Sequence, residues 1–337
     1  LDMKRWISID RTQPEPRRLS TDRMITAADI KLIKVMGFDH VKVLFTPSRF
    51  MTSDGGLNKD NLWYVERVVS RVLKQDMPCV ICIHPRLPFK EKYLGSLEQF
   101  GVLLRFYENF ARYIARNWSA DKVAFQLMTE PGRNSPELDW TYLADRMWGV
   151  VRNVMPDHTL ITSGDKAGNI LQLQKMSPAT DPNLVYSFTT YEPYPFGFNN
   201  MMGARAGNTW WKRVGPIPYP ASPSIIASQM DVLLKNVPAA DRKAARRAML
   251  AYGRGDALGR YNRDWHFARA RAIDRWRKKY GGTIHVQCVE FGCLDAVVAR
   301  QRHGGPGVLA ADRQAYIRDM RESFEAFDIA WTYWSYN

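Results

Sequence analysis

Residues 122–130 read KVAFQLMTE and residues 283–290 read TIHVQCVE; both are apolar runs of strand character that stop at a glutamate. Glu130 closes the first run, and Glu290 closes the second. A strand that carries a carboxylate at its last residue places it at the rim of a sheet rather than in the core. Two carboxylates on one rim can supply a general acid and a nucleophile at a glycosidic bond. A lone glutamate at a strand end is more often solvated or a cap, so the hypothesis depends on the scaffold.

The scaffold is predicted from the alternation of apolar runs with amphipathic helical stretches. Eight strands are predicted at Arg5–Ile9, His40–Phe45, Pro78–His84, Lys122–Glu130, Thr159–Ser163, Leu184–Tyr191, Ile284–Glu290 and Ala330–Trp334. Helices are predicted at Ile25–Gly37, Leu62–Gln75, Leu97–Asn117, Glu137–Met155, Ile170–Met176, Tyr261–Tyr280 and Ala310–Phe327, the first with Thr26 as its N-cap. Strand and helix repeated about eight times imply a parallel sheet that closes as a (β/α)8 TIM barrel. A doubly wound open sheet is the alternative, which the absence of a G-x-G-x-x-G after the first strand weakens.

The longest departure from this rhythm is a segment of about 196–259, after the sixth predicted strand. It begins with loop-rich sequence and continues into a basic helical stretch, Ser224–Tyr252. In a barrel, such an insertion lies on the catalytic face and shapes the cleft. Neither an internal repeat nor a low-complexity linker interrupts the chain, so residues 1–337 are expected to form a single catalytic domain.

The composition is that of an ordinary globular chain, with 45% hydrophobic and 24% charged residues among 337. No run approaches the roughly 20 apolar residues that a membrane span needs. The formal net charge is +14, and basic clusters lie at residues 242–247 and 269–279. Such a balance attracts nucleic acid, anionic lipid or acidic polysaccharide, although a solvated helix face is the plainer reading. Neither zinc-finger spacing nor an RNA-binding signature supports a nucleic-acid partner.

Four cysteines are present, and Cys79 and Cys82 have C-x-x-C spacing. This pair falls within a predicted strand, where residues three apart point to opposite faces and cannot easily share one metal ion. Cys288 and Cys293 flank Glu290 and could pair only if the chain turned sharply after Phe291. All four thiols are therefore expected to be free, and neither a metal nor an organic cofactor is indicated.

Barrel enzymes place their chemistry at the carboxyl ends of the strands. The predicted strand ends carry Lys42, His84, Glu130, Asp165, the run from Thr189 to Tyr191, Glu290 and Trp334. Alternation predicts that Glu130 shares the inner face with Ala124, Gln126 and Met128, and that Glu290 shares it with Ile284, Val286 and Cys288. Both carboxylates are thus expected to point inward.

With these residues at its strand ends, the chain resembles glycoside hydrolase family 5, which lies within the clan of retaining (β/α)8 glycosidases. The resemblance covers nearly the whole chain and rests on the order and spacing of several phrases: GFDHVKV, HP, LMTEP, DPNLVYSFTTYEPYPF, PIPYP, VEFG and WTYWSY. It implies that Glu130 is the acid/base and Glu290 the nucleophile of a double displacement. It also implies that His84 and Tyr191 line the −1 subsite and that Trp334 is a platform under the sugar ring. No cofactor is implied.

Three positions depart from the family pattern. Thr129 replaces the usual Asn before the acid/base, Lys42 replaces the usual Arg on the second strand, and Thr189 replaces the usual His on the sixth. These changes indicate either a pocket reshaped for an unusual sugar or a non-catalytic or weakly active carbohydrate-binding protein on the same scaffold. Trp210 and Trp211 either pack the insertion or stack against outer sugars.

The expected partner is an oligo- or polysaccharide, acidic polymers included, with no nucleic acid and no membrane span. A β-glucan or related polysaccharide, such as a bacterial exopolysaccharide, is the expected substrate. The sequence starts at Leu1 without an initiator Met or a signal peptide, as a mature chain would. We expect a secreted or periplasmic monomer.

Overall fold

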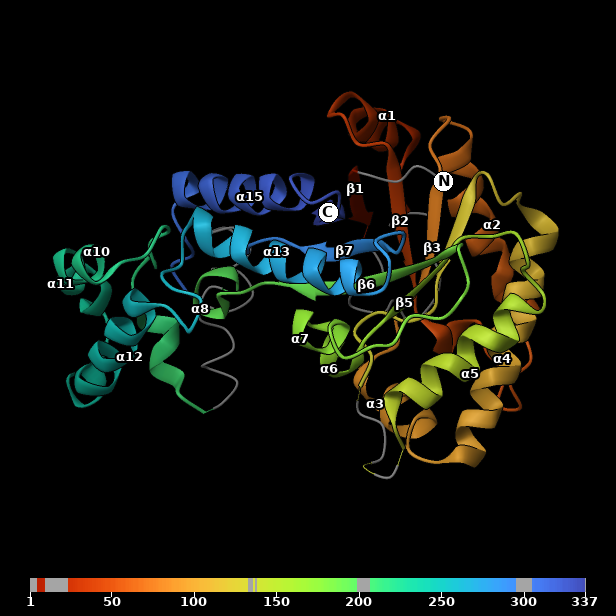
Figure 1. Cartoon of the computed structure of the whole chain (residues 1–337), viewed down its shortest axis with the longest axis horizontal. Coiled ribbons are helices and arrows are strands. Elements are labelled where there is room, and N and C mark those ends of the chain that lie inside the picture. Colours follow the sequence, from red (N-terminus) through yellow and green to blue (C-terminus); the bar gives the residue numbers. More distant parts are fainter. Residues whose placement is uncertain are drawn as a thin grey trace. The chain divides into compact units, whose positions relative to one another are not determined.

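The computed structural model describes residues 5–9, 24–132, 136, 138–198, 207–294 and 305–336 (Figure 1). It contains two compact units. One unit comprises Leu1–Thr189, Arg277–Glu290 and Ala330–Asn337, and it holds the strands. The other comprises Thr190–Trp276 and Phe291–Ile329, and it holds most of the segment predicted as an insertion. That residues 1–337 act as a single catalytic domain stays a prediction.

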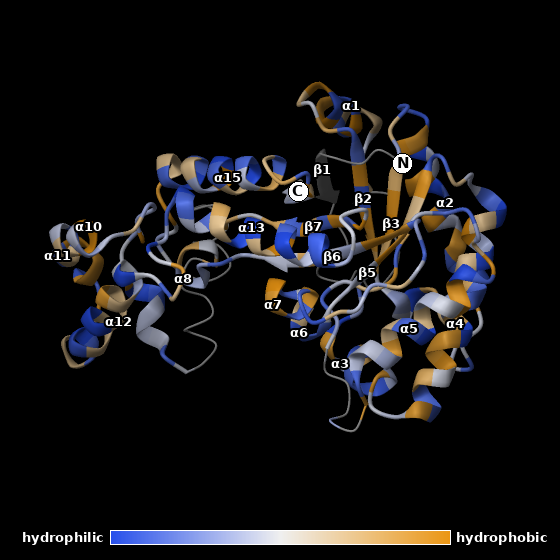
Figure 2. Ribbon diagram, in the orientation of Figure 1, coloured by the Kyte–Doolittle hydropathy of each residue, from blue (hydrophilic) through white to orange (hydrophobic). Residues whose placement is uncertain are grey.

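The strands close into a barrel in sequence order, which confirms the predicted (β/α)8 fold. They are β1 (Arg5–Ile9), β2 (His40–Phe45), β3 (Cys79–Ile83), β4 (Val123–Gln126), β5 (Leu160–Ser163), β6 (Leu184–Thr190), β7 (His285–Phe291) and β8 (Ala330–Tyr336). The pairs from β1 to β6 and the pair of β1 with β8 are parallel. Their register sets Lys42 beside Val80. Strands β2 and β3 are hydrophobic along most of their length (Figure 2).

Helices α1 (Ala27–Val35), α2 (Lys59–Leu73), α3 (Leu87–Tyr93), α4 (Leu97–Asn117), α5 (Trp140–Arg152), α6 (Asp165–Gly168) and α7 (Ile170–Leu173) belong to the barrel unit. The predicted start of α1 is confirmed, because Thr26 and Asp29 form a reciprocal capping box. Gly37 follows the helix with a φ of +87°, a conformation that glycine adopts without a Cβ penalty.

Alternate residues of the strands separate the inside of the barrel from its helical cover. Phe125 of β4 lies with its ring 6.2 Å from that of Tyr107 and 6.0 Å from that of Phe110, both on α4. Its neighbours in β4 therefore face inward. Ala124 joins an inner cluster to which five consecutive strands contribute one residue each: Val80, Ala124, Ile161, Val185 and Val289. This apolar layer is the floor beneath the carboxyl ends of the strands.

The second unit contains α8 (Tyr194–Gly197), α10 (Pro223–Ser228), α11 (Met230–Leu234), α12 (Arg242–Arg254), most of α13 (Arg263–Lys279) and α15 (Ala310–Glu325). The prediction of one helical stretch over Ser224–Tyr252 is wrong in its continuity. Pro238 lies inside it with a ψ of 143°, and proline has no backbone N–H to continue a helix. The stretch is therefore divided into α10, α11, a short 3₁₀ turn (Ala239–Asp241) and α12.

All four cysteines are free and buried. In the described part of the chain, no helix combines the length and the apolar character needed to cross a bilayer. Nor do any three His, Cys, Asp or Glu side chains of those residues gather closely enough to hold a metal ion.

Candidate active site

Lys42 and Glu290 form a buried ion pair inside the barrel. The ammonium nitrogen of Lys42 on β2 lies 3.1 Å from Oε1 of Glu290 on β7 and donates a second hydrogen bond of 2.9 Å to the carbonyl oxygen of Val289. The side chain of Lys42 is 0% exposed and that of Glu290 is 5% exposed. Since buried charges are stable only when paired and hydrogen-bonded, this pair fixes the position of the carboxylate.

The neighbourhood of Glu290 departs from the predicted alternation. Val289 belongs to the inner apolar cluster, yet the adjacent carboxylate of Glu290 is also reached by the inward-facing Lys42. Strict alternation would send these two neighbours to opposite faces. The carboxylate of Glu290 reaches the inward-facing Lys42, and Val289 lies in the inner cluster beside it; that Cys288 shares this face stays a prediction.

Glu130 does not end a strand, contrary to the prediction from its apolar run. Strand β4 ends at Gln126, and Glu130 lies four residues later in a loop with a φ of +46°. That left-handed conformation is unfavourable for a residue with a Cβ, so surrounding contacts must hold it. Lys90 of α3, which is 8% exposed, donates a hydrogen bond to the carbonyl oxygen of Glu130. The next carbonyl, that of Pro131, accepts from the N–H of Ala167 at 2.7 Å.

Thr129 is buried and engaged with a cysteine. Its hydroxyl lies 2.8 Å from the sulfur of Cys82, and its backbone N–H donates to the carbonyl of Ile83 at 2.9 Å. Burial, opposed by the cation of Lys42, raises the pKa of the Cys82 thiol to about 11. The thiol is therefore protonated at neutral pH and can serve as a donor or an acceptor toward Thr129.

His84 follows β3 and lies beside Trp334 of β8. The two rings are 6.1 Å apart and meet edge to face at 80°. Burial, reinforced by the positive charges of Lys42, Lys90 and Arg86, lowers the pKa of His84 to about 3. The imidazole is consequently neutral across the range in which most enzymes work. Cations from β2 and α3 thus converge on the end of β3, where the sequence predicts substrate binding.

Thr189 on β6 is 7% exposed and belongs to the same unit as the residues above. Tyr191, Trp210 and Trp211 belong to the other unit. There, the ring of Tyr191 lies 4.8 Å from that of Phe198. The indoles of Trp210 and Trp211 stack on each other at 4.6 Å, and Trp210 is only 9% exposed. The ring of Trp210 is therefore mostly covered, in part by Trp211.

Lys90 was not predicted from the sequence. It lies in LPFKEKY, four residues after Arg86, and reads as one of several basic side chains on a short surface helix. The signal in the sequence is the HPR stretch at 84–86, which continues directly into α3. A pocket of about 490 Å³ also lies here, between the turn after β2 and α3. It is lined by Ser48, Met51, Thr52, Ser53, Arg86, Pro88, Phe89, Lys92 and Tyr93.

The sequence resembles a known protein family and several known proteins. The family described as cellulase (glycosyl hydrolase family 5) matches residues 11–244. Cellodextrinase A of Ruminococcus flavefaciens is 26% identical over 219 residues, which make up 63% of this chain and 61% of that protein. Endoglucanase 3 of Fibrobacter succinogenes is 24% identical over 248 residues, or 68% of this chain and 33% of that protein. The chain thus spans less than two thirds of the length of either relative.

Solved structures share the fold at low sequence identity. The clostridial cellulose synthase subunit Z from Clostridioides difficile superposes with a TM-score of 0.71 at 19% identity, covering 99% of this chain and 92% of that one. Endoglucanase Cel5A from Thermotoga maritima superposes with a TM-score of 0.70 at 18% identity, covering 99% and 90%. These likenesses concern the barrel architecture.

Proposed function

Because this chain belongs to the cellulase family, glycosyl hydrolase family 5, we propose that it is a retaining glycoside hydrolase acting on β-glycosidic bonds. The substrate is a glucan or a related polysaccharide, bacterial exopolysaccharides included. Glu290 is the nucleophile and Glu130 is the acid/base. The observation that carries this proposal is the buried contact of 3.1 Å between Lys42 and Glu290 at the end of β7.

In the first step, Glu290 attacks the anomeric carbon while Glu130 gives a proton to the departing glycosidic oxygen. The contact with Lys42 orients the attacking carboxylate, because an ammonium group in a dry interior strongly attracts an anion. Orientation of this kind lowers the activation barrier because the carboxylate is already held in a geometry suited to attack. The covalent glycosyl-enzyme then carries no charge on Glu290.

In the second step, Glu130 removes a proton from water, which displaces the sugar from Glu290. The hydrogen bond from Lys90 to the carbonyl of Glu130 supports the loop geometry that aims this side chain. His84 stays neutral and, with Trp334, forms an edge of the −1 subsite. Trp211 is a candidate stacking surface for outer sugars, while Trp210 is the less accessible of the two.

The departures at Thr129, Lys42 and Thr189 bear on the sugar that is accepted. The Thr129 hydroxyl lies against Cys82, which favours a substrate that makes no strong contact at the position usually served by an asparagine amide. A sugar that differs from the glucose of cellulose at its 2-position fits this arrangement. The same departures keep open a carbohydrate-binding protein with little or no turnover, which the following experiment separates.

The test is Glu290→Ala, assayed on an aryl β-glycoside and on a panel of β-glucans, mannans and bacterial exopolysaccharides. Turnover should disappear, and azide should partly restore it on the activated glycoside by occupying the vacated space. Glu98→Ala, at an exposed carboxylate in the first turn of α4, is the matched control and should retain full activity. Unchanged activity of Glu290→Ala without azide would disprove the assignment. No hydrolysis by the parent protein at high enzyme concentration would favour the binding protein.

A further inference from the structure

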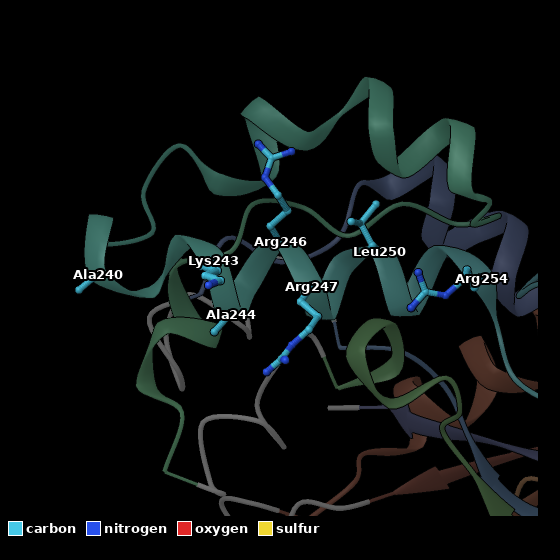
Figure 3. Close-up of a pocket in the computed structure, with 7 residues that line it drawn as sticks. All are labelled: Ala240, Lys243, Ala244, Arg246, Arg247, Leu250 and Arg254. Carbon is cyan, nitrogen blue, oxygen red and sulfur yellow. The ribbon is translucent and has the colours of Figure 1, made fainter.

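A basic groove lies on α12, wholly within the second unit. We name it the α12 groove, and its volume is about 580 Å³. Its lining consists of Ala240, Lys243, Ala244, Arg246, Arg247, Leu250 and Arg254 (Figure 3). Four of these seven residues are cationic, and all four are exposed. The other three are apolar, so the groove offers charges around an aliphatic surface.

The cations are held on a fixed platform. The buried side of α12 comprises Ala245, Met249, Tyr252 and Gly253. The hydroxyl of Tyr252 donates to the carbonyl of Pro218 at 3.0 Å. A Cβ at Gly253 would lie only 2.8 Å from Ile226 of α10, so the absence of a side chain allows the two helices to pack closely. The exposed side of α12 therefore presents its charges from a helix that is packed against the rest of the unit.

None of the four cations of the α12 groove forms an ion pair with a carboxylate of the described residues. Two arginines elsewhere in this unit are paired: Arg269 with Glu192, and Arg263 with Glu322. Lys243 and Arg254 are eleven residues apart, which separates them by about 16 Å along a helix. A row of like charges repels itself and favours binding of an extended anion.

We propose that the α12 groove binds an acidic polysaccharide, through carboxylate groups on its sugars. This deepens the proposed function, on which it rests, by naming the class of polymer that the protein engages. Guanidinium groups match carboxylates with two parallel hydrogen bonds. The aliphatic surface of Leu250 and the two alanines can contact the apolar face of a sugar between the charged groups.

The groove fits nucleic acid and anionic membranes less well. Among the residues that the structure describes, no aromatic side chain lines it, whereas single-stranded nucleic acid is usually held by stacking of bases on aromatic rings. A membrane-binding helix would expose a broad apolar face beside its basic residues. On α12 the buried side packs within the unit instead, and Leu250 is the one large apolar residue among the seven described residues that line the groove.

The test measures binding of the intact protein to polygalacturonate, a linear polyuronate, by affinity electrophoresis, with hydroxyethyl cellulose as the neutral polymer. The groove variant carries Lys243→Glu, Arg246→Glu and Arg247→Glu. The control variant carries Lys31→Glu, Lys175→Glu and Arg275→Glu, three exposed residues outside the groove. Both triples change the net charge equally, so a general effect of charge would affect them alike.

The groove variant should bind polygalacturonate about tenfold more weakly, or about 1.4 kcal/mol, and the control variant should bind as the parent does. Binding by the parent should weaken with added salt. A milder triple to Gln at the groove positions should give a smaller loss, which keeps the test valid if charge reversal disturbs folding. Equal losses in the groove and control variants, or no binding by the parent, would overturn the proposal. Tighter, groove-dependent binding to duplex DNA or to anionic vesicles would overturn it too.

This outcome is separable from that of the proposed function. Glu290→Ala should bind polygalacturonate as the parent does, and the groove variant should hydrolyse a small neutral aryl β-glycoside at the parental rate. If the parent protein binds polygalacturonate but hydrolyses none of the tested glycosides, only the catalytic proposal is contradicted.

Discussion

The ammonium group of Lys42 lies 3.1 Å from the carboxylate of Glu290, and both side chains are almost completely buried. Each of these charges would be costly without the other. Lys42 also donates to the carbonyl of Val289, so it contacts both the side chain and the backbone of β7 beside the proposed nucleophile. The lysine ammonium group is a compact charge, whereas an arginine guanidinium is planar and can donate two parallel hydrogen bonds to a carboxylate.

Lys42→Met should lower kcat on an aryl β-glycoside by about 10²-fold, because the carboxylate loses its orienting cation. It should also lower the free energy of unfolding by about 3–5 kcal/mol, since a buried carboxylate is left without its partner. Steady-state kinetics and urea denaturation measure the two effects. Lys42→Arg keeps the charge and should recover most of the kcat. Full activity of Lys42→Met would contradict a role for this pair in catalysis.

Lys90→Met should impair Glu130 in its proposed role as general acid, because Lys90 donates a hydrogen bond to the carbonyl of Glu130. The loss should depend on the leaving group. For an alkyl or sugar leaving group that needs a proton, kcat/KM should fall about tenfold or more. A dinitrophenyl glycoside needs little proton donation and should be cleaved nearly as before.

The exposed neighbour Lys92 supplies the matched control, and Lys92→Met should leave both substrates unaffected. A uniform loss on both substrates after Lys90→Met would instead indicate a structural defect.

Thr129→Asn should raise activity on cello-oligosaccharides and lower it on the native sugar. An asparagine amide can donate to the 2-hydroxyl of the −1 sugar, a contact worth about 1–3 kcal/mol in the transition state. Thr129→Val preserves the shape but removes the hydroxyl that contacts Cys82, so it tests that hydroxyl alone. The ratios of kcat/KM on the two substrates measure the effect. If cello-oligosaccharides are already the best substrates of the parent and Thr129→Asn changes nothing, this position does not encode specificity.

His84→Gln should make the protein less sensitive to acid. The pKa of His84 falls from 6.5 to about 3 on folding, first because of burial and then because of Lys42. Between those values the unfolded chain binds a proton that the folded chain does not, so stability decreases as the pH falls through this window. At pH 5 the penalty is about 2 kcal/mol. Urea denaturation at pH 7 and pH 5 should show a smaller drop for His84→Gln, and an identical drop would show that His84 is not the source.

The barrel was predictable because its signals are periodic. Short apolar runs and capped amphipathic helices recur along the chain, and α4 (Leu97–Asn117) has the predicted bounds. The position of Glu130 was not predictable in the same way. Leu127 and Met128 continue the apolar run, although the strand β4 has already ended at Gln126. Hydrophobic residues in a sequence indicate burial, but they do not distinguish a strand from a buried loop. The role of Lys90 depends on a contact 40 residues away, which no local pattern contains.

Because β4 stops at Gln126, the placement of Glu130 is shared among three segments rather than inherited from one strand. Lys90 holds one carbonyl of this loop, and Ala167 holds the next. A chimera that exchanged only β4 with another barrel would therefore import a carboxylate without its supports. A transfer that kept these supports would move the loop of Glu130 together with α3 and residues 165–168. Variation in either neighbour would reorient the proposed acid while Glu130 itself stays unchanged, a route by which such barrels can diversify.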